Sequence, residues 1–327
     1  MKVTVLSGGV GGARFTRGLL ALLRDRLPDG VGGTTASVTV VANTGDDMWL
    51  HGVRVCPDLD TLMYTLGGAV HEEQGWGRRD ESRRVSDDLQ AYGLGWEWFT
   101  LGDLDLATHL ARTELLRRGL PLSEVTARLA SRWGLGVRLL PATDSEVETH
   151  VLVDGGSIHF EEWWVRHRAA LPARGFEQVG LVGSVAAPGV VEALQDADVV
   201  VLPPSNPVVS VGTILAIPGV GEALRATTAP VVGVSPVIGG APVRGMADAC
   251  LTAIGVETDA AAVARHYGRR VDGGVLDAWL VDTADRAAAD ALRDDGWTVR
   301  AVPTLMTDVA TTAQIAADAL TLVDRLP

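Results

Sequence analysis

The chain has 327 residues, of which 47% are hydrophobic and 21% charged, and it carries a formal net charge of −13 at pH 7. These values are typical of a soluble globular protein with a large core, and they exclude a disordered or fibrous chain. The acidic charge argues against nucleic-acid binding, no apolar run reaches the roughly 18 residues of a membrane span, and Cys56 and Cys250 are too few for a disulfide framework. We therefore expect a cytoplasmic protein whose partners are small molecules, with no nucleic acid and no membrane.

The first part of the chain predicts alternating strands and helices. An apolar strand at 3–6 is followed by a glycine-rich loop and by a helix with Phe15, Leu19 and Leu22 on one face. A second apolar strand at 38–42 ends at an Asn-Thr-Gly-Asp-Asp segment. Strand–loop–helix–strand units of this kind build parallel sheets that are covered by helices.

Residues 66–165 differ from this pattern, and we expect them to form a smaller inserted α+β lobe. They contain two helical patterns near 104–118 and 122–133, and a hairpin that pairs 147–153 with 157–160 through an Asp-Gly-Gly turn. They also contain three tryptophans that either pack in a core, which is the default, or stack on the flat ring of a ligand: Trp76, Trp96 and Trp98.

The strand–helix pattern returns in the last part of the chain. Apolar strands are predicted at 199–202, 230–234 and 279–282, and each ends in a polar or Gly/Pro-containing loop. We therefore expect an α/β fold with a Rossmann-like parallel sheet core and helices on both faces, formed by residues 1–65 and 166–327.

The glycine-rich loop has the context of a phosphate-binding loop, because it follows a buried strand and precedes a helix. Its glycines allow close approach of the backbone, and the helix N-terminus offers free N–H groups to an anion: Gly8, Gly9, Gly11 and Gly12. The loop matches neither the dinucleotide fingerprint nor a P-loop, so a tight turn without a ligand is the alternative. Lys2 is the only lysine, so an anionic ligand must be held by backbone amides, arginine or a metal.

Four acidic residues follow the second predicted strand. Asp46 and Asp47 come directly after it, and Asp58 and Asp60 begin a predicted helix. Because parallel sheets bind ligands beyond the carboxyl ends of their strands, we expect all four at the functional edge, where oxygen ligands suit Mg²⁺. Without a cation, repulsion should raise some of their pKa values. The alternative is that Asp58 only caps the helix and the others are solvated surface charges.

Two later loops also follow predicted strands and carry polar groups. Ser205, Asn206 and Pro207 follow one strand, and Ser235 follows the next. Pro207 suits the first turn of a helix, which Ser205 or Asn206 would cap, or these side chains present polar groups to a ligand. The spacing does not separate capping from ligand binding.

Together these motifs resemble one family along nearly the whole chain, the 2-phospho-L-lactate transferases of coenzyme F420 biosynthesis. Each motif is common, but their combination in this order is specific. The segments that carry the resemblance are LSGGVGG at 6–12, NTGDD at 43–47, HG at 51–52, PDLDT at 57–61, GWG at 75–77, LGD at 101–103, PSNP at 204–207, SP at 235–236 and TLM at 304–306.

The resemblance implies a transferase that requires Mg²⁺. In that reaction the terminal ribityl hydroxyl of the deazaflavin Fo attacks the phosphorus that bears a three-carbon acid in a guanosine diphosphate-linked donor, and GMP leaves. It also implies nucleotide contacts from the glycine loop, Asn43 and the two later loops, and metal ligation by the four aspartates. Asp58 or Asp60 would act in catalysis by accepting the hydroxyl proton.

The arginine-rich composition resembles actinobacterial members of the family, for which the donor is enolpyruvyl-diphospho-guanosine and the product dehydro-F420-0. The lactyl donor, which gives F420-0, is the alternative. We also expect a homodimer. One departure from the family pattern is Leu104, where an arginine is common, so another residue must replace any phosphate or Fo contact of that arginine.

Two other classes of protein are weighed against this transferase. The first is a nucleotide-sugar-binding regulator of the related gluconeogenesis-factor family without transfer activity, which would not need the acidic residues at 46–60. The second is a dinucleotide-dependent oxidoreductase, which is disfavoured because no G-x-G-x-x-G follows the first strand.

Overall fold

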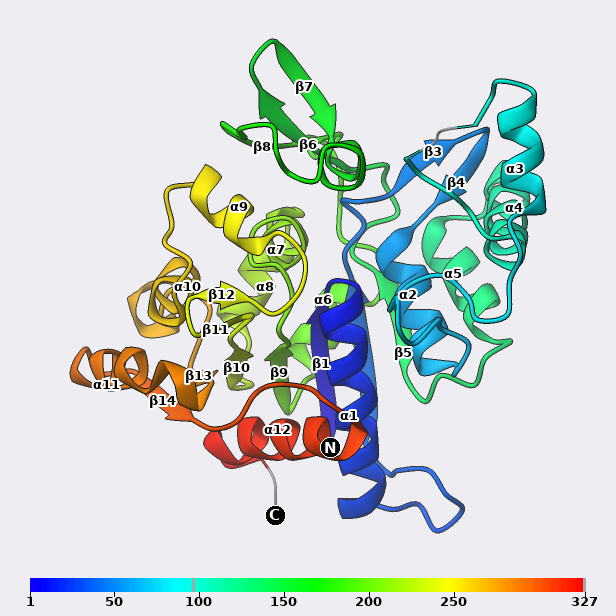
Figure 1. Ribbon diagram of the computed structural model, residues 1–327. Coiled ribbons are helices and arrows are strands. Elements are labelled where there is room, and N and C mark those ends of the chain that lie inside the picture. Colours follow the sequence, from blue (N-terminus) through cyan, green and yellow to red (C-terminus); the bar gives the residue numbers. More distant parts are fainter. Residues whose placement is uncertain (96–97, 326–327) are drawn as a thin grey trace.

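The computed structural model describes residues 1–95 and 98–325, and a seven-stranded sheet forms its centre (Figure 1). Every neighbouring pair of strands in this sheet is parallel. From one edge to the other the strands are β14 (Thr298–Ala301), β13 (Ala278–Val281), β10 (Val231–Val234), β9 (Val199–Leu202), β1 (Lys2–Ser7), β2 (Ser37–Ala42) and β5 (Arg138–Pro141). The predicted α/β fold with a Rossmann-like parallel sheet is therefore confirmed.

Apolar side chains at alternate positions bury both faces of the sheet. In β9, Val199 and Val201 pack on one face, whereas Val200 and Leu202 pack on the other. The first face is covered by α1 (Val10–Arg26), α2 (Pro57–Leu66) and α12 (Val309–Leu322). The second face is covered by α6 (Val190–Gln195), α7 (Val211–Ala216), α8 (Val220–Ala226), α10 (Ala260–Tyr267) and α11 (Arg286–Asp294). None of the helices in the described ranges has both the length and the apolarity needed to cross a membrane.

The chain leaves the centre of the sheet in two opposite directions. From β1 it proceeds through β2 to β5 at one edge, and it then returns to β9 on the other side of β1 and continues outward to β14. Connections that diverge from neighbouring strands leave a crevice at the carboxyl ends of those strands, which here are β1 and β9. The loops that follow these strands define the edge where a ligand is expected.

Between β2 and β9, the chain forms two groups of elements outside this sheet. The first contains β3 (Met48–Leu50), β4 (Val53–Val55), α3 (Arg84–Ala91), α4 (Asp103–Arg117) and α5 (Leu122–Ala130). The second is an antiparallel sheet, at the top of Figure 1, of β6 (Glu148–Val153), β7 (Gly156–His159) and β8 (Gly175–Val179). The helices predicted near 104–118 and 122–133 are α4 and α5, and the predicted hairpin is β6–β7.

The predicted boundaries of a single inserted lobe, at 66 and 165, require correction. β5 lies within that range but pairs with β2 in the main sheet, whereas β8 lies beyond it and pairs with β6. β5 was missed because its Arg-Leu-Leu-Pro sequence lacks the continuous apolar run that marks β9, β10 and β13, which are equally short. Its Leu139 and Leu140 are buried on opposite faces of the sheet, so no polar alternation marks the strand either.

The contact between α1 and α12 depends on a glycine. A Cβ atom built on Gly18 would lie 2.5 Å from Cγ2 of Thr312 and 2.8 Å from the carbonyl carbon of the same residue. We predict that Gly18→Ala lowers the free energy of unfolding by roughly 1–3 kcal/mol because the two helices must move apart. This effect opposes the intrinsic helix propensity, which favours alanine by about 1 kcal/mol. Denaturant unfolding measures the change.

A matched control is Asp25→Ala at the exposed end of α1, which should change the free energy of unfolding by no more than about 0.5 kcal/mol. A Gly18→Ala protein as stable as its parent would show that the two helices are not held at this separation.

Candidate active site

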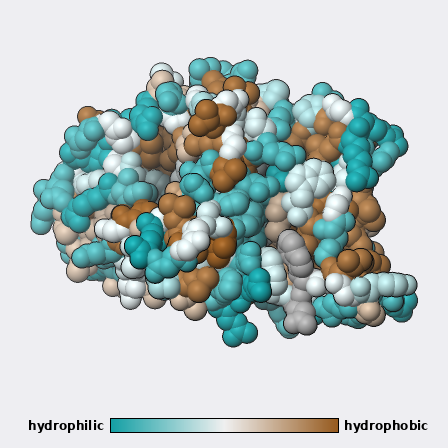
Figure 2. Space-filling view, turned by 90° about the horizontal axis from the view of Figure 1, so that it is seen from above, coloured by the Kyte–Doolittle hydropathy of each residue, from teal (hydrophilic) through white to brown (hydrophobic). Residues whose placement is uncertain are grey.

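A cleft with a volume of about 990 Å³ opens at the carboxyl edge of the main sheet. It is lined by the loops that follow β1, β2, β9 and β10, together with residues of α2 and α4 and of the segment after β7. Figure 2 views the molecule from above and shows a band of hydrophilic residues across the middle of that face, with hydrophobic residues on both sides. The volume is in the range of small-molecule sites.

The glycine loop between β1 and α1 is packed tightly against the loop that follows β9. The Gly8 N–H donates to Oγ of Ser205 at 3.1 Å, and a Cβ built on Gly11 would lie 2.1 Å from the carbonyl oxygen of Pro204. Gly11 lines the cleft, whereas Gly8 and Gly12 are not among its lining residues in the described ranges. This packing alone requires glycine at position 11.

Asp58 connects the glycine loop to the end of β2. Its carboxylate accepts hydrogen bonds from the Gly9 N–H and, at 3.0 Å, from Nδ2 of Asn43. Oδ1 of Asn43 accepts from the Gly45 N–H at 2.9 Å, so both polar side-chain atoms of this fully buried residue are engaged. Asn43 therefore orients Asp58, and its predicted nucleotide contact has no support in this geometry. Asp58 does not cap α2, which has no side-chain cap.

Asp46, Asp58 and Glu161 form a group of buried acidic residues that we call the carboxylate cluster. Burial, and then repulsion by Asp58 and Glu161, raises the pKa of Asp46 well above its usual range, and its Oδ1 has no hydrogen-bond partner. Burial raises the pKa of Asp58 to about 6, against the hydrogen bonds that it accepts. Burial and repulsion by Asp58 raise the pKa of Glu161 to about 8. The cluster therefore lacks positive charge.

The carboxylate cluster fits a divalent cation. Its oxygen atoms are the ligands that Mg²⁺ prefers, and within the described part of the chain no arginine, lysine or histidine forms an ion pair with any of the three. No sequence motif marks Glu161 as a site residue. It follows the β6–β7 hairpin, and no sequence spacing connects it with Asp46 or Asp58.

Asp47 lies in different surroundings from its neighbour Asp46. Its Oδ2 is 3.9 Å from Nη2 of Arg54, and Nη1 of Arg54 is 2.9 Å from Oε1 of Glu148. Burial raises the pKa of Asp47 to about 7. It is not among the residues that line the described cleft, although it interacts electrostatically with Asp46 and Asp60.

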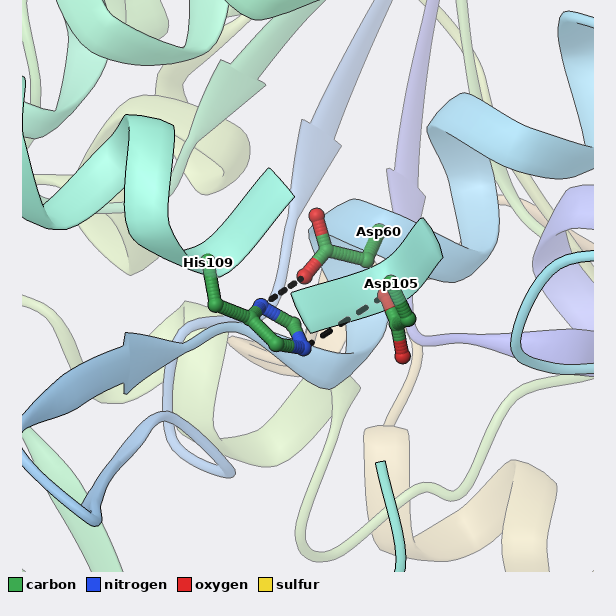
Figure 3. Close-up of side chains that lie close together, drawn as sticks. All are labelled: Asp60, Asp105 and His109. Atoms are coloured by element: carbon green, nitrogen blue, oxygen red, sulfur yellow. Dashed lines mark ion pairs between the residues drawn. The ribbon is translucent and has the colours of Figure 1, made fainter. Parts of the chain in front are cut away.

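Asp60 belongs to a second acidic group, shared with α4 (Figure 3). His109 lies between two carboxylates, with Nδ1 3.5 Å from Oδ2 of Asp60 and Nε2 3.4 Å from Oδ1 of Asp105. Arg112 donates to Oδ1 of Asp60, and its Nη1 lies 3.1 Å from Nδ1 of His109. The three residues of Figure 3 offer ligand atoms within 4.8 Å of one another. The guanidinium already supplies positive charge there, so a divalent cation fits the carboxylate cluster better.

Helix geometry explains why Asp58 and Asp60 separate. Both lie in the first turn of α2, and residues two apart on an α-helix differ by roughly 200° in direction. The four predicted carboxylates therefore lie in three different environments. Asp46 and Asp58 belong to the carboxylate cluster, Asp47 lies beside Arg54, and Asp60 pairs with Arg112. The pKa values of all four are raised, but burial and not repulsion is the largest cause; repulsion by another carboxylate adds to the rise at Asp46, Asp47 and Asp60 and is not a cause of the rise at Asp58.

The two later loops reach the cleft, but their polar side chains also shape their own turns. Ser205, Asn206 and Ser235 line the cleft, whereas Pro207 is not among the lining residues described. Oδ1 of Asn206 accepts from the Val208 N–H at 2.9 Å, and the hydroxyl of Ser235 bonds to the backbone two residues further on. Pro207 does not begin a helix, because a turn precedes α7.

The cleft also contains residues that the sequence analysis did not single out: Arg14, Arg83, Arg244, Phe160 and Trp164. Of the three tryptophans considered as stacking residues, Trp76 and Trp98 line the cleft, and Trp96 lies outside the described residues. Leu104 is not among the described lining residues, whereas Arg83 is. The only local signal for any of these arginines is the position of Arg14, one turn into the helix that follows the glycine loop.

Comparisons with known proteins agree with the resemblance carried by the motifs. A family model described as 2-phospho-L-lactate transferase CofD matches residues 3–314. The chain is 55% identical over 330 residues to a phosphoenolpyruvate transferase of Streptomyces coelicolor, covering 100% of this chain and 99% of the relative. It is 56% identical over 326 residues to a phosphoenolpyruvate transferase of Thermobifida fusca, covering 98% of both. The chain therefore belongs to the CofD family of 2-phospho-L-lactate transferases.

A comparison with solved structures supports the fold. The crystal structure of a UPF0052 family member from Bacillus halodurans matches with a TM-score of 0.62 at 18% identity, covering 98% of each chain. At this identity the match shows a shared fold and nothing about activity.

The carboxylate cluster predicts how stability depends on pH without a metal. The pKa values of Asp58 and Glu161, about 6 and about 8 in the folded protein, exceed the ordinary values of 3.8 and 4.5. Folding therefore favours their protonated forms, and this stabilisation is lost as the pH rises through 6 and 8. We predict that the melting temperature in EDTA falls between pH 5 and 8.5, and that Mg²⁺ reverses the fall.

The variant Glu161→Gln isolates this effect. In EDTA it should melt higher than the parent at pH 8.5, on the order of a few °C, and show little difference at pH 4.5. The exposed Glu257→Gln serves as the control, with an unchanged pH profile. An identical pH profile for Glu161→Gln and the parent would show that Glu161 is not a source of repulsion.

Proposed function

We propose that the protein transfers a phosphoenolpyruvyl group from a guanosine diphosphate-linked donor to the ribityl hydroxyl of Fo, releasing GMP and giving dehydro-F420-0 in the coenzyme F420 pathway. The observation that carries this proposal is the carboxylate cluster in a cleft of about 990 Å³, where Asp58 is hydrogen-bonded to the glycine loop. Family membership supports the reaction class. The enolpyruvyl donor is favoured over the lactyl donor because the relatives are named phosphoenolpyruvate transferases.

The carboxylate cluster is the part of the site that we assign to Mg²⁺. Asp46 and Asp58 are the proposed ligands, and Glu161 lies next to them in the cluster. None of the three carboxylates has an ion-pair partner in the described ranges. The bound ion would neutralise the donor diphosphate and orient it for in-line attack. Asp47 and Asp60 are not included, since arginines already balance their charge.

Asp60 is the proposed acceptor of the hydroxyl proton. It lines the cleft, and its Oδ2 has no hydrogen-bond partner among the described residues. Burial raises its pKa, which makes the carboxylate a better base, and Arg112 and His109 fix its orientation. The proton of the attacking hydroxyl would pass to the carboxylate of Asp60 as the bond to phosphorus forms.

Aromatic residues of the cleft are suited to a flat deazaflavin ring. Trp98, Phe160 and Trp164 all line it, and Trp164 stacks on Phe160 with ring centroids 5.9 Å apart. Stacking on such side chains holds a planar heterocycle with little conformational cost. We place Fo against this wall and the nucleotide donor against the glycine loop.

The transfer is tested by mixing the protein with Fo, Mg²⁺ and either the enolpyruvyl or the lactyl guanosine donor. We expect dehydro-F420-0 and GMP from the enolpyruvyl donor at a higher rate than F420-0 from the lactyl donor, with no product in EDTA. Mass spectrometry identifies the products. Tight donor binding without product would favour the non-catalytic regulator instead.

Two substitutions separate the roles of Asp58 and Asp60. Asp58→Asn removes a proposed metal ligand, so half-maximal activity should need roughly tenfold more Mg²⁺. Asp60→Asn removes the proposed base, so kcat should fall on the order of 10²-fold while the Mg²⁺ requirement stays the same. Because Asp60→Asn also leaves the buried Arg112 without its partner, rates must be expressed per folded molecule.

The exposed Asp88→Asn is the control, and it should change neither parameter. Full turnover by Asp60→Asn would remove this residue from the mechanism, and an unchanged Mg²⁺ requirement in Asp58→Asn would move the ion elsewhere.

A further inference from the structure

Two arginines of the cleft carry charges that the protein does not neutralise. Arg14 lies in α1, and Arg244 lies in the loop between β12 (Ala241–Pro242) and α9 (Ala247–Ala253). In the described part of the chain neither forms an ion pair, and their hydrogen bonds go to backbone carbonyl oxygens. Arg14 interacts electrostatically with Glu72, but the carboxylate of Glu72 forms its ion pair with Arg17, at 2.6 Å. Both guanidinium groups are therefore available to an anion.

One loop fixes both arginines. Nη2 of Arg14 donates to the carbonyl oxygen of Glu72 at 3.2 Å, and Nη2 of Arg244 donates to the carbonyl oxygen of Gln74. The two guanidinium groups come from distant parts of the chain, but they are anchored two residues apart on the same backbone. Among the described residues, no acceptor beyond these carbonyl oxygens and that of Glu73 engages the two guanidinium groups, which leaves their other N–H groups for a ligand.

The Gly-Trp-Gly motif at 75–77 explains how the loop accommodates Arg244. Gly75 has φ +82°, and a Cβ built on it would lie 2.9 Å from Nη1 of Arg244 and 3.0 Å from Cγ1 of Val10. The ring of Trp76 lies 5.4 Å from the guanidinium carbon, at cation–π distance. Since Val10 is the first residue of α1, Arg244 is held beside the N-terminus of that helix.

Positive charges therefore lie close together at one end of the cleft. Burial, and then repulsion by Arg14, lowers the pKa of Arg244. The N-terminus of α1, a helix of 17 residues, adds the positive end of its dipole. Such an arrangement costs free energy in the free protein, and an anion that binds there relieves it.

We propose that Arg14 and Arg244 bind the carboxylate of the three-carbon acid carried by the donor. The proposal rests on the function proposed above, in which the diphosphate lies with the cation at the carboxylate cluster, so that the carboxylate is the remaining anionic group of the transferred unit. The planar guanidinium groups match a carboxylate with paired hydrogen bonds. The pair would thereby distinguish the donor from GDP and from the product GMP, which lack this group.

Calorimetry in Mg²⁺ tests the proposal with three ligands: the enolpyruvyl donor, GDP and phosphoenolpyruvate alone. We expect Arg244→Ala to weaken donor and phosphoenolpyruvate binding roughly 10- to 100-fold, as for loss of a charged hydrogen bond, and to change GDP binding less than about twofold. Arg14→Ala should act in the same direction. Arg132→Ala is the matched control, because Arg132 also lies over a tryptophan, at 4.7 Å from the Trp133 ring, but outside the cleft.

Each outcome decides between the alternatives. Equal losses for the donor and GDP would overturn the proposal and place the diphosphate at the arginines. Unchanged donor and phosphoenolpyruvate binding, or no binding of either ligand by the parent protein, would also overturn it. If the parent transfers nothing to Fo but binds phosphoenolpyruvate in an Arg244-dependent way, the transfer reaction fails while the carboxylate site stands. Circular dichroism confirms that each variant is folded.

Discussion

The cleft is governed by one electrostatic constraint, which is that buried charges of like sign cannot remain ionised together without a counter-charge. In the carboxylate cluster this constraint is unmet by the protein, since Asp46 has an unpaired oxygen and the pKa values of Asp58 and Glu161 are raised to about 6 and about 8. At Asp60 the same constraint is met internally, by Arg112. This difference is the reason that we propose different roles for two aspartates on one helical turn, one beside a cation and the other in proton transfer.

The glycine loop links the acidic and basic parts of the cleft. Asp58 accepts a hydrogen bond from the N–H of Gly9 in this loop. The next residue, Val10, lies against Gly75, which is also close to Arg244. Carboxylates and guanidinium groups are therefore held at the same helix N-terminus without pairing with each other. A ligand that carries both a metal-bound diphosphate and a carboxylate would satisfy both groups at once, which neither GDP nor Mg²⁺ alone can do.

The parts of this architecture that could be predicted from the sequence are those with a local signal. The apolar runs of β1, β2, β9, β10 and β13 and the glycine turn of the β6–β7 hairpin are such signals, and their strands formed as predicted. β5 has only two apolar residues between Arg138 and Pro141 and so lacks such a run, and the predicted boundary of the inserted lobe was therefore wrong. Glu161 and Arg244 reach the cleft from distant loops, and only the folded chain places them there.

Motif residues also show why a pattern alone cannot separate structural from functional roles. Gly11 lies where a side chain would strike the Pro204 carbonyl, and Asn206 stabilises its own turn, yet both also line the cleft. Close packing of the loops and access for a ligand both demand glycine here. A ligand can approach the backbone only where no side chain covers it, and the loops pack closely for the same reason. Asn43 is the limiting case, since it is not among the lining residues and acts on the cleft through its hydrogen bonds with the carboxylates of Asp58 and Asp46. A site built in this way requires its buried positioning residues as strictly as those that would touch the ligand.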